Sequence, residues 1–185
     1  MRAERIATDL DYDGTQLRSH FARRTCGIAG DSIVAFEGAC HVETEALVDL
    51  EDRLAGTFIR ARRMLHFIVE HFEEDLERAV LRQRMLVVLA AETLAVLSGR
   101  SCERRGDDLF VDGGKLSVSI ATRSPVSTLI HLGLNIDAEG APVETADLGA
   151  LGVAPASVAD ELLRRYVEEM SGIAAARCKV LGVPG

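Results

Sequence analysis

The stretch RRGDDLFVDGGKLSVSIAT, residues 104–122, decides the fold of this chain. Apolar and polar side chains alternate on both sides of Gly113-Gly114, which is typical of two antiparallel strands joined by a two-residue turn. The predicted cross-strand pairs are Asp112 with Lys115, Phe110 with Ser117, and Asp108 with Ser119. Alternate side chains then lie on opposite faces. The predicted apolar face comprises Leu109, Val111, Leu116, Val118 and Ile120, and the polar face comprises Asp108, Asp112, Lys115, Ser117 and Ser119.

Other stretches also have the pattern of strands. Residues 129–136 place Ile130, Leu132, Leu134 and Ile136 on one side and His131, Gly133 and Asn135 on the other. Residues 63–72 are apolar at alternate and intervening positions, which favours a strand buried on both faces. Nearer the N-terminus we predict a short strand over residues 5–11 and a β-hairpin formed by residues 32–36 and 39–42 around Gly38.

Two long helices complete the predicted domain. Between residues 74 and 98, Leu81, Met85 and Leu89 recur at four-residue spacing until Gly99 ends the pattern. A second helix is expected from near residue 157, with one apolar face made of Val158, Leu162, Tyr166, Met170 and Ile173. Residues 139–152 form the expected long surface loop. The sequence therefore predicts one α+β domain over residues 1–185, with a mixed, largely antiparallel sheet backed by helices.

Composition excludes several classes of protein. The net charge of −8 argues against a nucleic-acid partner, because such binding needs many cations against phosphates. The apolar run over residues 85–91 is far shorter than the roughly 20 residues that span a bilayer. With no apolar signal core at the N-terminus, we expect a cytoplasmic protein without a membrane contact. The four cysteines lack a CxxC pair and the histidines lack ligand spacing, so no metal site is expected.

Lysine is rare in this chain, which draws attention to its position. Of 21 basic residues, only Lys115 and Lys179 are lysines. A lysine offers a compact, rotatable ammonium that a guanidinium cannot imitate. On the polar face of the predicted hairpin, Lys115 is therefore a candidate functional residue. The alternative interpretation is a solvated turn lysine paired with Asp112.

Further candidates surround Lys115 or carry charge elsewhere. Polar residues that would shape a pocket around it are Asp107, Asp108, Ser117, Ser119 and His131. His131 is equally compatible with an ordinary, partly buried histidine. A basic, glycine-bearing loop containing Arg23, Arg24, Gly30 and Asp31 could bring backbone amides to a phosphate or carboxylate. The cysteines lack an adjacent base and are interpreted as buried apolar residues.

The segment Asp11-Tyr-Asp-Gly-Thr15 resembles the opening motif of the haloacid-dehalogenase-like phosphatases. That resemblance implies a nucleophile at Asp11, a general acid at Asp13 and magnesium dependence. It also requires parallel strands with helical crossovers, whereas the stretch after Gly106 predicts an antiparallel hairpin. An Asp-Gly turn with polar flanks is the competing interpretation.

Two further resemblances concern most of the chain. The sequences DYDGT, GDSIV, RGDDL, KLSVSIAT and HLGLNI resemble those of domain-of-unknown-function family 366 over nearly the full length. More remotely, GDDLFVDGGKL followed by a strand ending GLNI is similar to the biotin and lipoate protein ligases. That similarity implies a catalytic lysine at Lys115, a motif aspartate at Asp108, and a later strand marked by Gly133 and Asn135.

The ligase resemblance implies a function as well as a fold. A lysine in that position would stabilise negative charge while an acyl-adenylate forms or is attacked, with ATP as the implied cofactor. Residues 23–30 match the ligases' adenylate loop only in part, so transfer from an already activated acyl carrier, with a role for Cys26 or Cys178, stays open. A non-catalytic ligand sensor or a homo-oligomeric interaction module is the alternative function.

Overall fold

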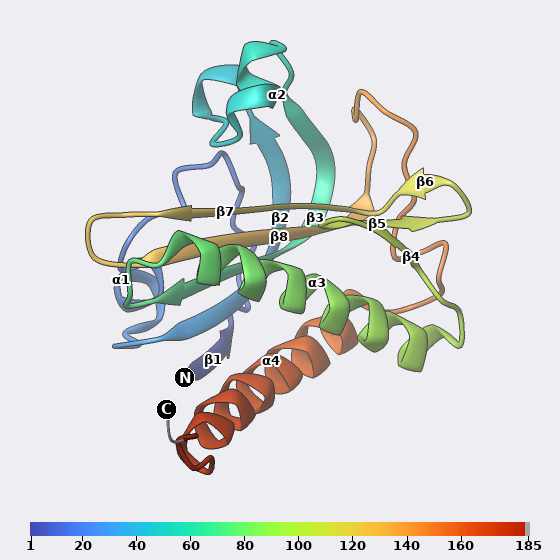
Figure 1. Ribbon diagram of the computed structural model, residues 1–185. Coiled ribbons are helices and arrows are strands. Elements are labelled where there is room, and N and C mark those ends of the chain that lie inside the picture. Colours follow the sequence, from blue (N-terminus) through green and yellow to red (C-terminus); the bar gives the residue numbers. More distant parts are fainter. Residues whose placement is uncertain (184–185) are drawn as a thin grey trace.

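The central element is a five-stranded sheet with the strand order β1-β2-β3-β8-β7 (Figure 1). The structure is a computed structural model that describes residues 1–183. Only β1 and β2 run parallel, whereas the other neighbours are antiparallel. The strands of this sheet are β1 (Arg2–Arg5), β2 (Ser32–Val42), β3 (Ile59–His71), β7 (Ser117–Arg123) and β8 (Thr128–Asp137). A smaller sheet contains β4 (Glu103–Arg105), β5 (Asp108–Val111) and β6 (Gly114–Lys115).

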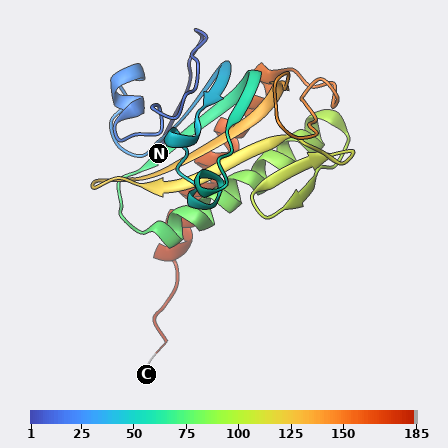
Figure 2. The ribbon, with the colours of Figure 1, turned by 90° about the horizontal axis from the view of Figure 1, so that it is seen from above.

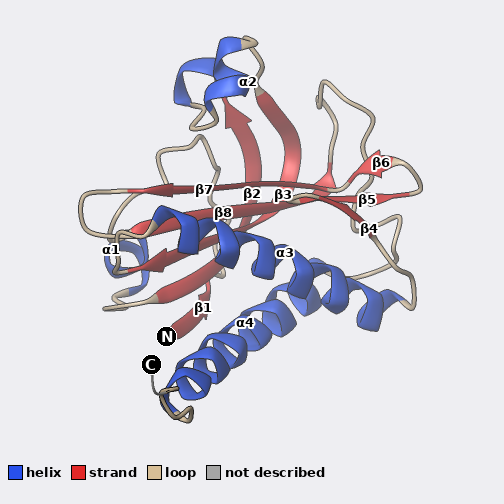
Figure 3. Ribbon diagram, in the orientation of Figure 1, coloured by secondary structure: helices blue, strands red, loops and turns tan. Residues whose placement is uncertain are grey.

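Two long helices cover one face of the main sheet (Figure 3). The first, α3 (Leu76–Ser98), begins where the Asp75 side chain accepts a hydrogen bond from the Arg78 backbone and ends at left-handed Gly99. The second, α4 (Pro155–Cys178), begins with a proline in its first turn, where the missing N–H costs no helical hydrogen bond. Shorter helical segments are α1 (Phe21–Cys26), η1 (Thr44–Ala46) and α2 (Leu50–Leu54). The predicted helices are thus present.

The sheet has a hydrophobic cluster on each face. Leu65, Phe67 and Val69 of β3 pack toward α3 and α4, where the larger cluster lies. Met64 and Ile68 belong to the second cluster on the opposite face. As a result every position of β3 from residue 64 to residue 71 is buried, including the polar residues His66, Glu70 and His71.

The predicted N-terminal hairpin is wrong. Residues 32–42 form one continuous strand, which pairs with β3 and has a β-bulge between Gly38 and Cys40. A Cβ at Gly38 would lie 2.1 Å from the Leu10 carbonyl oxygen, so this glycine permits a close backbone approach, which is the other common role of a glycine within a strand. The predicted strand over residues 5–11 is also displaced, because β1 ends at Arg5.

The hairpin around Gly113 has a different register from the predicted one. Val111 pairs with Gly114 and Phe110 with Lys115, so the turn residues are Asp112 and Gly113. Both have positive φ, 51° and 90°, as a two-residue type I′ turn requires.

The strand that follows the hairpin belongs to the main sheet, where it pairs with β8. As a result Val118 packs with the second hydrophobic cluster, opposite to the predicted face. Ser119 instead meets Gln83 of α3 through its hydroxyl. In β8, by contrast, Ile130, Leu132 and Leu134 face the helices as predicted.

Candidate functional site

A cavity of about 410 Å³ lies on the sheet face opposite α3 and α4. Its floor comes from β7 and β8, and its other walls come from the β2–β3 connection, which contains η1 and α2, and from the loop after β8. Figure 1 shows α2 at the far ends of β2 and β3, on the other side of β7 and β8 from the two long helices. Many wall residues are apolar, including Val42, Leu47, Phe58, Ile59, Val118 and Ile120.

Lys115 lines this cavity with its backbone fixed on both sides. Its N–H donates to the Glu144 carbonyl at 3.0 Å, and its carbonyl accepts from the Ala146 N–H at 3.0 Å. The Asn135 side-chain amide donates to the same Lys115 carbonyl, also at 3.0 Å. Figure 2 shows the loop after β8 beside the small sheet that carries Lys115. The backbone of Lys115 is therefore fixed by three segments of the chain, namely the loop after β8, β8 itself and β5, with which it pairs.

The ammonium itself pairs with Asp108 rather than with the predicted Asp112. Lys115 Nζ lies 2.8 Å from Asp108 Oδ2, and about a third of each side chain is exposed. Asp112 instead forms an ion pair with Arg100 at 2.7 Å. The register of the hairpin explains the difference, because Lys115 lies opposite Phe110 and therefore beyond the turn. Lys115 and Asp108 are thus brought together at the cavity wall.

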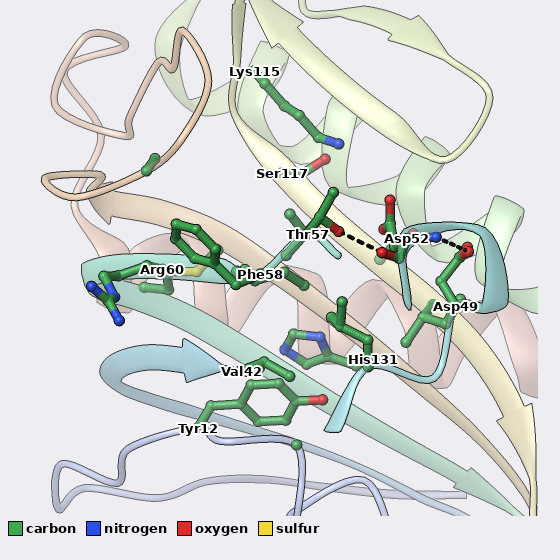
Figure 4. Close-up of a pocket in the computed structure, with 18 of the residues that line it drawn as sticks. Tyr12, Val42, Asp49, Asp52, Thr57, Phe58, Arg60, Lys115, Ser117 and His131 are labelled. Atoms are coloured by element: carbon green, nitrogen blue, oxygen red, sulfur yellow. Dashed lines mark hydrogen bonds between the residues drawn. The ribbon is translucent and has the colours of Figure 1, made fainter. Parts of the chain in front are cut away.

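The remaining polar candidates near Lys115 also line the cavity, but most are held by neighbours. Gln83 Nε2 donates to Asp107 Oδ2 at 2.9 Å and to Ser119 Oγ at 2.7 Å. Ser117 Oγ accepts a hydrogen bond from the Leu109 N–H at 2.8 Å. These contacts fix the small sheet against α3 and β7. Figure 4 shows Ser117 beside the Lys115 side chain.

His131 forms part of the cavity floor. Its imidazole stacks on the ring of Tyr12, with centroids 4.0 Å apart and planes 8° from parallel (Figure 4). His131 Nε2 lies 3.1 Å from Nδ1 of the buried His66. Burial lowers the pKa of His131 well below its usual value, and the adjacent His66 lowers it further. Burial likewise lowers the pKa of His66 to about 3, so both imidazoles are neutral at pH 7.

The basic loop near the N-terminus lies elsewhere. Asp31, at the start of β2, accepts hydrogen bonds from the Phe72 N–H and from His71 at the end of β3. The cavity is lined by Val42 and Ile59, which lie at the other ends of the same two strands. That separation is about 35 Å along β2. Arg23, Arg24, Gly30 and Asp31 are not among the cavity residues.

Several cavity residues carried no signal in the sequence that we recognised. Asp49, Asp52, Thr57 and Phe58 reach the cavity from the β2–β3 connection, and Arg60 reaches it from the start of β3. The Asp49 side chain accepts hydrogen bonds from the first N–H groups of α2, an N-cap pattern that a search for short helices would detect. Nothing local in the sequence indicates that this connection folds over β7 and β8.

The structure does not have the architecture expected of a haloacid-dehalogenase-like phosphatase. Most of its sheet is antiparallel, whereas that class requires parallel strands with helical crossovers. The Asp13 carboxylate accepts hydrogen bonds from the backbone and hydroxyl of Thr15, which lower its pKa. Asp11 accepts from the Ala39 N–H. Asp13 therefore stabilises a local turn and Asp11 contacts the bulged part of β2, and the phosphatase interpretation is not supported.

Two general features concern metals and membranes. Within residues 1–183, no group of three or more histidine, cysteine, aspartate or glutamate side chains is arranged to hold a metal ion. Within the same residues, none of the helices combines the length and the apolar character needed to cross a bilayer.

The comparisons with known proteins identify the family. Residues 1–181 match the family model described as a domain of unknown function, DUF366. The chain belongs to the DUF366 family. An uncharacterized protein from Methanocaldococcus jannaschii is 38% identical over 171 residues, which cover 89% of this chain and 77% of that protein. A solved protein of unknown function from Pyrococcus horikoshi has a TM-score of 0.93 at 39% identity, covering 100% of this chain and 99% of that one.

The DUF366 chain also has the fold of the biotin and lipoate protein ligases. A biotin protein ligase variant from Aquifex aeolicus, solved in complex with biotin, gives a TM-score of 0.61 at 13% identity, covering 92% of this chain and 70% of the ligase. A lipoate-protein ligase A bound with ATP gives a TM-score of 0.59 at 14% identity, covering 92% and 86%. At such identities the likeness concerns the fold alone. It confirms the predicted α+β, ligase-like architecture.

Proposed function

We propose that this chain binds a small carboxylic acid or its acyl conjugate in the cavity above β7 and β8, and transfers or activates the acyl group. The observation that carries the proposal is the Lys115 ammonium, which lines a cavity of about 410 Å³ and whose backbone is fixed by three segments. The ligase-like fold adds support, because Lys115 lies in the hairpin of β5 and β6, whose sequence resembles the lysine motif of the ligases.

The chemistry of the lining suits such a ligand. An ammonium that is partly desolvated neutralises a carboxylate and stabilises the negative charge that develops on an attacked acyl oxygen. Asp108 Oδ2 lies 2.8 Å from Lys115 Nζ and holds the ammonium in position. The apolar walls, among them Val42, Phe58 and Ile120, would remove the hydrocarbon part of the ligand from water.

The charges of the lining favour an already activated donor over ATP. Among the lining residues, Lys115 and Arg60 are the cations, against Asp49, Asp52, Asp107 and Asp108. A triphosphate is a polyanion that needs several positive or N–H contacts. We therefore favour transfer in which an acceptor nucleophile attacks the acyl carbonyl of a thioester. The thiol leaves and takes up the proton that the acceptor loses.

A covalent route through a cysteine has less support. Neither Cys26 nor Cys178 lines the cavity. Burial raises the pKa of the Cys26 thiol, and the nearby Glu4 raises it further, so its reactive thiolate is disfavoured. This observation favours direct transfer to an acceptor. It also leaves a non-catalytic ligand sensor as the second candidate, because the described cavity contains no cysteine nucleophile.

The proposal is tested with purified protein and a Lys115→Ala variant. Transfer is followed by mass spectrometry after incubation with an octanoyl thioester of an acyl carrier protein and candidate acceptors. Activation is followed by pyrophosphate exchange with ATP and biotin, lipoate, octanoate or amino acids. Lys179→Ala is the matched control, because Lys179 follows α4 and lies outside the cavity.

The outcomes separate the two candidate functions. Turnover that Lys115→Ala abolishes and Lys179→Ala leaves unchanged supports the enzyme. Binding of an acid that depends on Lys115, with no turnover under any condition, supports the sensor. If every acid and conjugate fails to bind the parent protein, the proposed function is wrong.

A further inference from the structure

The cavity floor contains a ring nitrogen that no part of the described chain satisfies. His131 is 3% exposed and lines the cavity. Its Nε2 faces Nδ1 of His66 at 3.1 Å, and its ring lies flat on Tyr12. Within residues 1–183 its other nitrogen, Nδ1, has no hydrogen-bonding partner. Among the described residues, the fully buried side-chain atoms that lack a hydrogen-bonding partner are His66 Nε2 and Thr93 Oγ1. His131 Nδ1 lacks a partner but is not one of these atoms, so it is accessible from the cavity.

The partner histidine determines whether that nitrogen carries a proton. The hydrogen bond made by one ring nitrogen sets the tautomer of an imidazole. Burial lowers the pKa of His66, and the Gly38 backbone acts in the opposite direction, as a carbonyl oxygen near the ring would. His66 Nδ1 faces His131, so the proton directed at the carbonyl belongs to Nε2, although the contact falls short of a full hydrogen bond.

The protons of the pair then follow from one another. With its proton on Nε2, His66 can only accept at Nδ1, so His131 must donate from its own Nε2. A neutral His131 that donates from Nε2 has a lone pair on Nδ1. The opposite tautomers would make His131 Nδ1 a donor, and the nitrogen NMR measurement below distinguishes the two arrangements. His66 is therefore a positioning residue for His131.

We infer that His131 Nδ1 is a hydrogen-bond acceptor for the ligand, and that the ligand is a small acid with a hydroxyl, amide or similar donor at the end away from its carboxylate. The inference rests on the proposed function, because Lys115 defines the carboxylate end. Asn135, whose amide holds the Lys115 carbonyl, is four residues from His131 on the same face of β8, about 13 Å along the strand. An acid without a donor would leave the nitrogen unpaired and desolvated.

Calorimetric titration with octanoate and its ω-hydroxy derivative tests the ligand class. These two probes differ only in the terminal donor. The hydroxy acid should bind the parent protein about threefold to tenfold more tightly, the effect of one added hydrogen bond. His131→Phe should remove this preference, so that the two probes bind with similar affinity. His131→Gln, which keeps an acceptor, should restore part of the preference.

Two controls distinguish the inference from the proposed function. Lys115→Ala should weaken both probes and leave their ratio unchanged. His71→Phe changes another buried histidine of β3 that lies outside the cavity, and it should leave the ratio as in the parent. Equal binding of the probes by the parent protein, or a preference that survives in His131→Phe, overturns the inference while Lys115 retains its role. Failure of both probes to bind overturns the proposed function and the ligand class together.

The tautomer has its own readout, which needs no ligand. Nitrogen NMR of histidine-labelled protein at neutral pH should show His66 and His131 both protonated at Nε2 and unprotonated at Nδ1. A spectrum with the His131 proton on Nδ1 contradicts the inference even if the hydroxy acid binds. His66→Phe removes the acceptor for His131 Nε2–H, so the His131 signal should shift toward a mixture of tautomers.

Discussion

The buried pair of His66 and His131 makes this protein sensitive to mild acid. Burial lowers the pKa of His66 from 6.5 to about 3, so between these pH values this residue is protonated in the unfolded chain and neutral in the folded chain. The contribution of this residue to the free energy of unfolding is fully present above pH 6.5 and decreases as the pH drops below that value. At pH 5, about 1.5 units lower, the loss is about 2 kcal/mol, since one pKa unit corresponds to about 1.4 kcal/mol.

The assay is chemical unfolding at pH 7 and pH 5, followed by circular dichroism. The parent protein should lose about 2 kcal/mol more of its unfolding free energy between these pH values than His66→Phe does. His131 is present in both proteins, so its own contribution largely cancels in the difference. His41→Phe, at an exposed position of β2, is the matched control and should behave like the parent. Equal losses in the parent and in His66→Phe would refute the reasoning.

Three further substitutions probe the backbone and the cavity wall. Gly38→Ala places a Cβ 2.1 Å from the Leu10 carbonyl oxygen, and it should cost about 3 kcal/mol or more in thermal or denaturant unfolding; a loss below about 1 kcal/mol would mean that this crossing is loose. Gly114→Ala places a Cβ 2.7 Å from the Thr145 backbone, so it should expose the loop after β8 to limited proteolysis while the sheet stays folded, and an unchanged cleavage pattern would contradict this. Asp108→Asn removes an ion pair whose two side chains are each about a third exposed, so stability should change by less than about 1 kcal/mol. Its effect should appear in ligand affinity instead, because the cavity lysine loses its partner. Unchanged affinity would show that the ion pair does not contribute to binding.

Much of the architecture follows from local sequence patterns. The long helices have apolar stripes, a capping aspartate or proline at the start, and in one case Gly99 at the end. The doubly buried β3 and the alternating β8 were likewise predictable from their patterns, because burial on one or both faces constrains every position. Ile173 was the exception on α4, since 43% of it is exposed beyond the end of the packed face.

Turn chemistry limited the prediction around the candidate site. Two consecutive glycines at 113–114 suggest a turn between them, yet an aspartate tolerates left-handed φ, and Asp112 occupies the first turn position with φ 51°. That displacement moved the partner of Lys115 from Asp112 to Asp108. The face of Val118 differs for another reason, because β7 leaves the hairpin and pairs with β8 in the main sheet. A small error in register therefore changes which side chains share a surface.

Local sequence patterns do not predict where the basic loop lies or which segments form the outer walls of the cavity. Arg23 and Arg24 have the composition of an anion-binding loop, but composition does not say at which end of β2 the loop will lie. Residues 44–58 and the loop after β8 both line the cavity, and neither segment has a periodic pattern that indicates where the other lies. Such contacts are set by the tertiary fold rather than by local preference.

The two faces of the main sheet differ in how tightly they are packed. On one side, α3 and α4 pack against the strands through a continuous apolar cluster, and substitutions there would destabilise the fold. The opposite side is hollow and is enclosed in part by η1 and α2, neither of which contains a buried residue. Substitutions in that enclosure should therefore cost less free energy of unfolding than substitutions in the apolar cluster beneath α3 and α4.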